Sequence, residues 1–166
     1  MKTNYKLVLR NITTFIFDID GVLTNGQLLV TTDGHLLRSM NVRDGYAFKH
    51  AIKAGYKIFI ISGGKNKGVV KRLNNLGVED IYLGIDDKVK QLNAILDKEQ
   101  IDLENIAYMG DDIPDIPPMK LVGLPTCPQD AEPEVKNIST YISHRNGGCG
   151  CARDLIEQVM KVQSKW

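Results

Sequence analysis

The sequence predicts an α/β protein built on a doubly wound, mostly parallel, Rossmann-like sheet, and three observations support this. Short apolar runs rich in β-branched and aromatic residues alternate along the chain with segments of helical periodicity. Acidic or small polar residues follow several of these runs directly, at the edge where parallel sheets bind ligands. One stretch breaks the alternation, and its pattern is that of an inserted β-hairpin.

The expected elements follow one another in a regular order. We expect strands at residues 14–17, 57–61, 80–83, 106–109, 121–124 and 140–142. We expect helices at residues 45–54, 67–76, 88–99, 113–120, 131–136 and 153–162. Alternation of this kind predicts helices on both faces of the sheet. The hairpin should cover about residues 26–41, with Thr32-Asp33-Gly34 as its turn, and it is too apolar to remain uncovered.

Length and composition set the broad class of the protein. The 166 residues suggest one domain over 1–166, and the 43% hydrophobic share is enough for a packed core. A net charge of +1 gives no strong field for nucleic acid or for a membrane surface. Because there is no apolar signal core and no run long enough to span a bilayer, we expect a cytoplasmic protein.

The three cysteines, Cys127, Cys149 and Cys151, are an odd number. Without a secretion signal, this favours free thiols in a reducing compartment. Cys149 and Cys151 do not form a Cys-x-x-Cys pair and have no histidine cluster beside them, so a zinc site is not expected.

Two aspartates follow the first expected strand directly. Asp18 and Asp20 come after a buried-type apolar run, and Gly21 lets the chain turn away. At a parallel strand's carboxyl end, such carboxylates can hold a divalent cation, attack an electrophile or move a proton. Taken alone, Asp18 and Asp20 are as typical of an ordinary polar loop after a strand as of a functional site.

The next two strand ends carry groups suited to phosphate. Ser62-Gly63-Gly64 offers a hydroxyl and backbone N–H groups that can approach phosphate oxygens closely, although it is also common turn sequence. Lys88 stands at the start of an expected helix, where the dipole disfavours a cation. We therefore expect it to neutralise an anion, the alternative being a solvated surface lysine.

Three further carboxylates, Asp111, Asp112 and Asp115, follow the fourth strand after Gly110. One acid is enough to cap a helix, so three within five residues indicate another purpose. Hard oxygen ligands without histidine or thiolate point to Mg²⁺.

In this order and position, the four features resemble the haloacid dehalogenase superfamily of phosphotransferases. Its four motifs match Asp18/Asp20, Ser62, Lys88 and Asp111/Asp112/Asp115. The capless subfamily, which includes the 3-deoxy-D-manno-octulosonate 8-phosphate (KDO 8-phosphate) phosphatases, is similar at Gly21–Thr24, the hairpin, Asn41–Gly45, Gly147–Gly150 and Arg153. The resemblance covers nearly the whole chain, and the intervals between the strands leave no room for a cap domain.

The resemblance implies a Mg²⁺-dependent phosphomonoesterase that works through an aspartyl-phosphate. Asp18 would be the nucleophile, and Asp20 the general acid and then the general base. Mg²⁺ would be held by the Asp18 carboxylate, the Asp20 backbone carbonyl and Asp111. The supporting groups would be Ser62, Gly63 and Lys88 on the phosphoryl oxygens, and Asp112 and Asp115 orienting Lys88 and metal-bound water.

The resemblance also implies a substrate and an assembly. The substrate would be a keto-sugar acid phosphate, most simply KDO 8-phosphate in lipopolysaccharide precursor synthesis, contacted by Gly63, Arg43, Lys67 and Arg153. Members of the subfamily are typically homotetramers whose hairpins pack together, so a neighbouring subunit would cover the site. One position departs from the family: Gly64 stands where an arginine is usual, and Lys65 and Lys67 follow it.

Other functions stay open from the sequence. The substrate can be a nine-carbon keto-sugar acid 9-phosphate or another sugar or polyol phosphate. A non-catalytic, receiver-like module that is phosphorylated on aspartate belongs to a different class. Receivers have no need of a leaving-group acid two residues after the phosphorylated aspartate, so Asp20 favours an enzyme.

Overall fold

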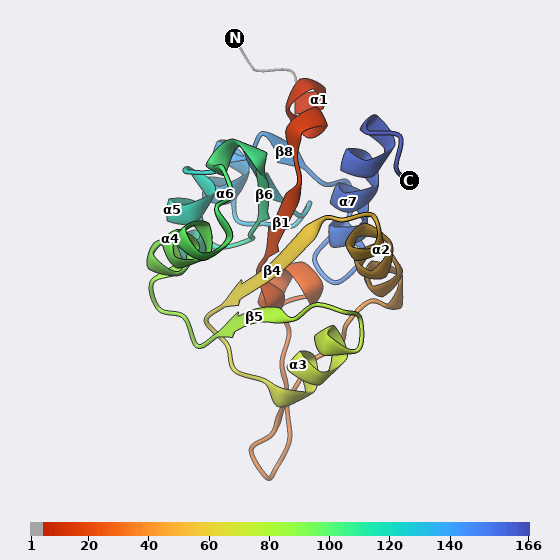
Figure 1. The fold of residues 1–166 in the computed structure, drawn as a ribbon. Helices are drawn as coiled ribbons and strands as arrows, with labels where there is room; N and C mark the ends of the chain where they lie inside the picture. Colours follow the sequence, from red (N-terminus) through yellow and green to blue (C-terminus); the bar gives the residue numbers. More distant parts are fainter. Residues whose placement is uncertain (1–4) are drawn as a thin grey trace.

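A computed structural model describes residues 5–166, and six parallel strands form its main sheet. The strands are β1 (Thr14–Phe17), β4 (Lys57–Ser62), β5 (Asp80–Leu83), β6 (Ile106–Met109), β7 (Leu124–Cys127) and β8 (Tyr141–Ile142). Their order in the sheet is β5-β4-β1-β6-β7-β8 (Figure 1). This confirms the predicted α/β class, and it places β1 between β4 and β6, with Phe17 opposite Ile60 and Met109.

Helices cover both faces of the sheet. On one face Phe15 and Phe17 pack into a core shared with α2 (Val42–Lys53), α3 (Lys67–Asn74) and α7 (Cys151–Val162). On the other face Ile16 packs into a core shared with α4 (Lys88–Glu99), α5 (Ile116–Met119) and α6 (Pro133–Ile138). Figure 1 shows these two layers of helices on opposite sides of the strands. Successive β1 side chains therefore alternate between two cores, which explains why all four residues of β1 are buried.

Short helical segments complete the fold. The segments α1 (Tyr5–Val8), Leu9–Asn11, Ile19–Leu23 and Leu103–Asn105 were not expected from the sequence. The segment Ile113–Asp115 runs directly into α5, so the expected helix at 113–120 is divided into two short pieces. None of the helices in residues 5–166 is long and apolar enough to cross a bilayer.

Several predicted boundaries were wrong by one to three residues, and two of these shifts have identifiable reasons. The helix expected from residue 45 begins at Val42, because the Asn41 side chain accepts a hydrogen bond from the Arg43 N–H at 2.8 Å and caps it. The strand expected at 121–124 lies three residues later, as β7. Leu121 donates its N–H to Pro118 at 3.1 Å and so belongs to the turn that ends α5. Pro125 makes β7 itself a poor strand pattern in the sequence.

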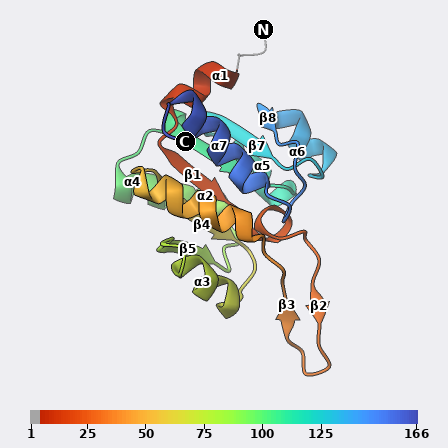
Figure 2. The same ribbon diagram turned by 90° about the vertical axis from the view of Figure 1, so that its right-hand side faces the viewer.

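The predicted hairpin is present, and it projects away from the body of the molecule (Figure 2). Its strands β2 (Leu29–Val30) and β3 (Leu36–Leu37) are short and pair antiparallel. Gly34 forms the turn with a φ of +84° and donates its N–H to Thr31 at 3.0 Å. The four strand residues are 42–66% exposed. Between β1 and β4 the chain adds this hairpin and α2, and between β4 and β5 it adds α3, so residues 5–166 contain no cap domain.

Candidate active site

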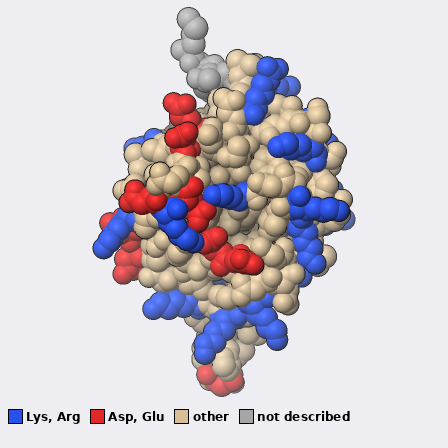
Figure 3. Space-filling model, viewed as in Figure 1, with Lys and Arg blue, Asp and Glu red and all other residues tan. Residues whose placement is uncertain are grey.

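The carboxyl ends of β1, β4 and β6 converge on one cavity of about 450 Å³. Asp18 follows β1, Ser62 is the last residue of β4, and Asp111 comes two residues after β6. The cavity is lined by Asp18, Asp20, Gly26, Ser62, Gly63, Gly64, Ile85, Asp86, Lys88, Asp111, Asp112, Pro114 and Asp115. On the face of the molecule seen in Figure 3, acidic and basic side chains lie close together. The sequence motifs at separate strand ends therefore meet in space.

Asp18 is buried at the floor of the cavity. Its Oδ1 accepts the Ile19 N–H at 2.6 Å, and its Oδ2 lies 2.9 Å from the Lys88 Nζ. Burial, followed by the nearby charge of Asp115, raises the pKa of Asp18 to about 6. Both oxygens are thus held in place on a side chain that is 11% exposed.

Lys88 is held by two carboxylates. Its Nζ donates to Asp115 Oδ1 at 2.7 Å and pairs with Asp18, and its side chain is only 5% exposed. Burial alone would lower the pKa of Lys88, but Asp115 and Asp18 outweigh it and raise the pKa. The dipole of α4 disfavours a cation at its first residue. Lys88 nevertheless stays charged there, because the carboxylates of Asp18 and Asp115 face it.

Asp115 organises the floor of the cavity. Its Oδ1 accepts from Lys88 and, at 3.0 Å, from the Tyr108 hydroxyl, while its Oδ2 accepts the Asp111 N–H at 3.2 Å. Asp115 is fully buried, so these contacts fix both Lys88 and the backbone at Asp111. Asp112 lies at the rim instead, exposed, with its Oδ1 accepting the Ile113 N–H at 2.7 Å.

The carboxylates form a group suited to a metal ion. Asp18, Asp111 and Asp115 each offer an oxygen, and these oxygens lie within 4.8 Å of one another. Asp111 Oδ1 is buried and has no hydrogen-bond partner, a costly state unless a cation satisfies it. Burial, then the charges of Asp115 and Asp18, raises the pKa of Asp111 to about 8. Hard oxygen donors with an orphaned carboxylate fit Mg²⁺.

Ser62, Gly63 and Gly64 also line the cavity, and Gly64 lies beside Asp20. Ser62 is 2% exposed, and its backbone oxygen accepts the Ile85 N–H at 3.1 Å. The Gly64 backbone oxygen accepts the Gly84 N–H at 3.2 Å, which ties this loop to the chain after β5. Lys67, the first residue of α3, is exposed and does not line the cavity.

Asp20 reaches the cavity from the turn after β1, where it contacts a residue that sequence reasoning missed. Arg38, at the base of the hairpin, donates from Nε to Asp20 Oδ1 at 2.7 Å and from Nη2 to Oδ2 at 3.0 Å. The Arg38 side chain is 6% exposed. One signal was available in the sequence: Arg38 is the only lysine or arginine in residues 26–41.

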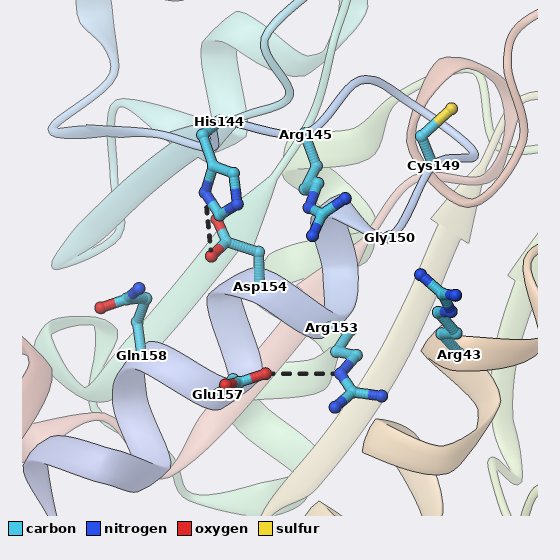
Figure 4. Close-up of a pocket in the computed structure, with 9 residues that line it drawn as sticks. All are labelled: Arg43, His144, Arg145, Cys149, Gly150, Arg153, Asp154, Glu157 and Gln158. Carbon is cyan, nitrogen blue, oxygen red and sulfur yellow. Dashed lines mark hydrogen bonds and ion pairs between the residues drawn. The ribbon is translucent and has the colours of Figure 1, made fainter.

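Arg43 and Arg153 lie elsewhere in the chain. They line a second cavity of about 470 Å³ together with His144, Arg145, Cys149, Gly150, Asp154, Glu157 and Gln158 (Figure 4). The Arg153 Nε pairs with Glu157 Oε2 at 3.3 Å, and its guanidinium packs 5.6 Å from the Tyr46 ring centroid and 5.4 Å from that of Trp166. Within one chain, the structure does not bring these arginines to the cavity that contains Asp18.

The cysteines are free and do not form a metal site among residues 5–166. Cys151 is buried, and its thiol donates to the Val22 backbone oxygen at 3.1 Å, whereas Cys149 is exposed. The loop that carries them packs against the turn after Asp20, because the Gly148 N–H also donates to Val22, at 2.9 Å. This segment therefore supports the turn that connects Asp18 and Asp20 to the hairpin.

Known proteins resemble the chain in sequence and in structure. Residues 80–153 match the family of haloacid dehalogenase-like hydrolases. Over 155 residues the chain is 37% identical to the 3-deoxy-D-manno-octulosonate 8-phosphate phosphatase KdsC of Salmonella typhi, covering 93% of this chain and 82% of that protein.

Two solved structures show the same fold. The 3-deoxy-D-manno-octulosonate 8-phosphate phosphatase of Yersinia pestis matches with a TM-score of 0.94 and 33% identity, over 96% of this chain and 86% of that one. The enzyme of Moraxella catarrhalis, solved with magnesium, phosphate and KDO, matches with a TM-score of 0.94 and 29% identity, over 99% and 94%. With the cavity of carboxylates, lysine and serine at the strand ends, these similarities show that the chain belongs to the 3-deoxy-D-manno-octulosonate 8-phosphate phosphatase family of haloacid dehalogenase-like hydrolases.

Proposed function

We propose that this protein is a Mg²⁺-dependent phosphomonoesterase that hydrolyses KDO 8-phosphate to KDO and phosphate. The observation that carries the proposal is the joint placement of Asp18, Lys88 and Asp111 in one cavity of a chain that is 37% identical to a curated phosphatase of this kind. Lipopolysaccharide precursor synthesis in the cytoplasm is the setting in which such a reaction would act.

In the first step, an Asp18 carboxylate oxygen attacks phosphorus and the bond from phosphorus to the sugar oxygen breaks. Asp20 gives its proton to the departing sugar oxygen. Lys88 and Ser62, with the backbone of Gly63, hold the equatorial phosphoryl oxygens, where negative charge builds up. The product of this step is an aspartyl-phosphate on Asp18 and the free sugar acid.

In the second step, water attacks the same phosphorus and the acyl-phosphate bond breaks. Asp20, now a carboxylate, takes the proton from that water, so the two steps return it to its starting form. Asp18 leaves as a carboxylate and inorganic phosphate is released. Asp115 keeps Lys88 directed at the phosphoryl group through the 2.7 Å contact, which supports a positioning role for it.

The side chains of Asp18 and Asp111 and the backbone carbonyl of Asp20 would hold the Mg²⁺. When bound, the ion neutralises charge that otherwise keeps a dianionic phosphate away from a carboxylate nucleophile. The orphaned Asp111 Oδ1 supports this donor set. Asp115 already accepts three hydrogen bonds, which favours a supporting role rather than direct ligation. Asp112, at the rim, would orient metal-bound water.

We further propose that the active unit is a homo-oligomer, most simply a tetramer, assembled through the hairpin. The exposed leucines and valine of β2 and β3 need a cover, and residues 5–166 contain no cap domain over the cavity. Closed symmetry would bury every hairpin equivalently. Arg43 and Arg153, which lie apart from the cavity of their own chain, would then serve a neighbour's substrate carboxylate, and Lys67, exposed at the start of α3, would join them.

A second candidate substrate belongs to the same reaction class. Gly64 stands where an arginine is usual in the family, so the cavity lacks one group that could grip a substrate carboxylate, and a nine-carbon keto-sugar acid 9-phosphate is the alternative to KDO 8-phosphate. The two are the alternatives within one reaction class, and they differ in the length of the chain between phosphate and carboxylate.

A phosphate-release screen tests the proposal. KDO 8-phosphate, a nine-carbon keto-sugar acid 9-phosphate, and neutral hexose phosphates are each offered with Mg²⁺ or with excess chelator, with Asp18→Asn as the control protein. We expect release from a keto-sugar acid phosphate only with Mg²⁺ and only by the wild-type protein. Release that persists in chelator, or that Asp18→Asn retains at a tenth of the wild-type rate or more, would contradict it.

A further inference from the structure

Arg38 makes the best-formed contact to Asp20 in the described structure. Its guanidinium meets the carboxylate with two parallel hydrogen bonds, at 2.7 Å and 3.0 Å. Such a fork-to-fork pair fixes the direction of a carboxylate as well as its distance, which a single point charge cannot do. The Asp20 side chain is 35% exposed, whereas that of Arg38 is 6% exposed, so the buried arginine defines the position and the aspartate adapts to it.

The guanidinium is itself fixed by its surroundings. Its Nη1 donates to the Leu36 backbone oxygen at 3.2 Å, and that oxygen also accepts the Asn66 side-chain amide at 3.0 Å. Asn66 in turn caps α3 by accepting the Val69 N–H at 3.0 Å. Arg38 is therefore tied to the hairpin and to the loop between β4 and α3 at once.

Gly64 leaves the space that the pair needs. A Cβ on Gly64 would lie 3.0 Å from Asp20 Oδ2 and 3.3 Å from Arg38 Nη2, so even a methyl group would press on both partners. Asp20 and Gly64 both line the cavity, so the contact between Asp20 and Arg38 lies at its edge.

We propose that Arg38 is a positioning residue that acts through Asp20: it aims the Asp20 carboxyl group at the leaving oxygen of the substrate. This inference rests on the acid role proposed above for Asp20. Misplacing a catalytic group by about 1 Å can cost on the order of 100-fold in rate, so the fork geometry matters as much as the charge. The hairpin thereby contributes to the chemistry of its own chain as well as offering a surface to others.

The test compares two leaving groups. An alkyl sugar oxygen needs a proton as it leaves, whereas p-nitrophenolate needs one far less. Arg38→Gln should lower kcat for KDO 8-phosphate about 10- to 100-fold while changing kcat for p-nitrophenyl phosphate less than about threefold. Arg38→Lys, which keeps a charge but loses the fork, should recover only part of the alkyl-phosphate rate.

Two further variants separate positioning from a general effect on the fold. In an Asp20→Asn background, Arg38→Gln should lower kcat for KDO 8-phosphate by no more than about a further twofold, because the two residues act as one unit. Gly64→Ala disturbs the contact between Asp20 and Arg38 without changing the hairpin. It should lower kcat selectively for the alkyl phosphate, by less than Arg38→Gln does. Arg10→Gln, at an exposed arginine in the segment Leu9–Asn11 away from the hairpin, is the matched control and should change neither activity.

Equal losses on both leaving groups in Arg38→Gln, a further large loss in the double variant, or no selectivity in Gly64→Ala would each overturn the assignment. Failure of the proposed function would look different. The wild-type protein would then not hydrolyse KDO 8-phosphate, and the same comparison would be made with whichever sugar phosphate it does hydrolyse.

Discussion

Gly21 has no room for a side chain, because the carboxylate of Asp111 occupies the place where its Cβ would be. The Cβ position lies 1.8 Å from Asp111 Oδ2, and Gly21 has a φ of +87°. The turn after β1 and the loop after β6 are therefore packed directly against each other at the metal-binding edge. The glycine that follows the two aspartates in sequence is thus needed for the position of a third aspartate, 90 residues later.

The first prediction follows from this contact. Gly21→Ala should displace Asp111 and weaken Mg²⁺ binding about tenfold or more, because a ligand must move by more than 1 Å. Titration calorimetry with Mg²⁺ measures it. Gly55→Ala is the matched control: Gly55 has a similar φ of +90° but no atom within 4 Å of its Cβ position, so it carries the backbone strain without the clash. Equal Mg²⁺ affinity in the two variants would refute the argument.

The second prediction concerns the pH dependence of Mg²⁺ binding. Without a cation, the pKa of Asp18 is about 6 and that of Asp111 about 8, so one or both must lose a proton when the metal binds. Mg²⁺ affinity should therefore rise about tenfold between pH 6.5 and pH 8.5. Calorimetry in two buffers of different ionisation enthalpy should detect proton release near pH 7. An affinity that is constant over this range, with no proton released, would be inconsistent with the buried carboxylates.

The third prediction concerns stability. Asp44 is buried, its Oδ1 accepts the Arg153 N–H at 2.8 Å, and its Oδ2 has no partner. Burial raises the pKa of Asp44 from 3.8 to about 6. Between these values the folded state binds more protons than the unfolded state, so this group makes stability fall as pH rises through that window.

Asp44→Asn keeps the acceptor and removes the charge. Relative to the wild-type protein, its free energy of unfolding should gain about 1–2 kcal/mol between pH 4 and pH 7.5. Urea unfolding of both proteins at the two pH values measures the difference. If the difference in free energy of unfolding between the two proteins does not change with pH, Asp44 is ionised at no cost in the folded state.

The fourth prediction concerns the hairpin. Leu29 and Leu37 face each other across β2 and β3 and are 66% and 48% exposed in the single chain. Replacing both with Asp should dissociate the proposed oligomer and weaken substrate binding together, since charge is strongly disfavoured in an apolar interface. Light scattering and KM measure the two effects. Leu121→Asp, at a position that is 44% exposed elsewhere, is the control. A fully active wild-type monomer at assay concentration would exclude this assembly.

Much of the fold was predictable because its signals are local. The strands at 14–17, 80–83 and 106–109 and the helix at 88–99 were predicted with the bounds that the structure has, since each is an apolar pattern with polar residues at its ends. The position of β7 was mispredicted because Pro125 has a poor strand propensity. In the structure, pairing with β6 overrides that propensity.

The site residues likewise fall into those that the sequence predicts and those that it does not. Asp18, Ser62, Lys88 and Asp111 were predictable because parallel strands bring their carboxyl ends together whatever the packing of side chains. The role of Arg38 was not predictable. Arg38 and Asp20 are 18 residues apart, and their contact depends on how the hairpin folds, which no periodic pattern in the sequence indicates. Likewise, no local pattern indicated that Arg43 and Arg153 line a cavity of their own.

The nucleophile is the central claim, and trapping the covalent intermediate tests it most directly. The protein is mixed with KDO 8-phosphate and Mg²⁺, quenched in acid within the first turnovers and reduced with borohydride, which converts an aspartyl-phosphate to homoserine. Peptide mass spectrometry then locates the converted residue. The account predicts homoserine at position 18, none at Asp20 or Asp111, and none anywhere when substrate is left out. Full turnover with Asp18 unconverted, or conversion at another aspartate, would contradict it.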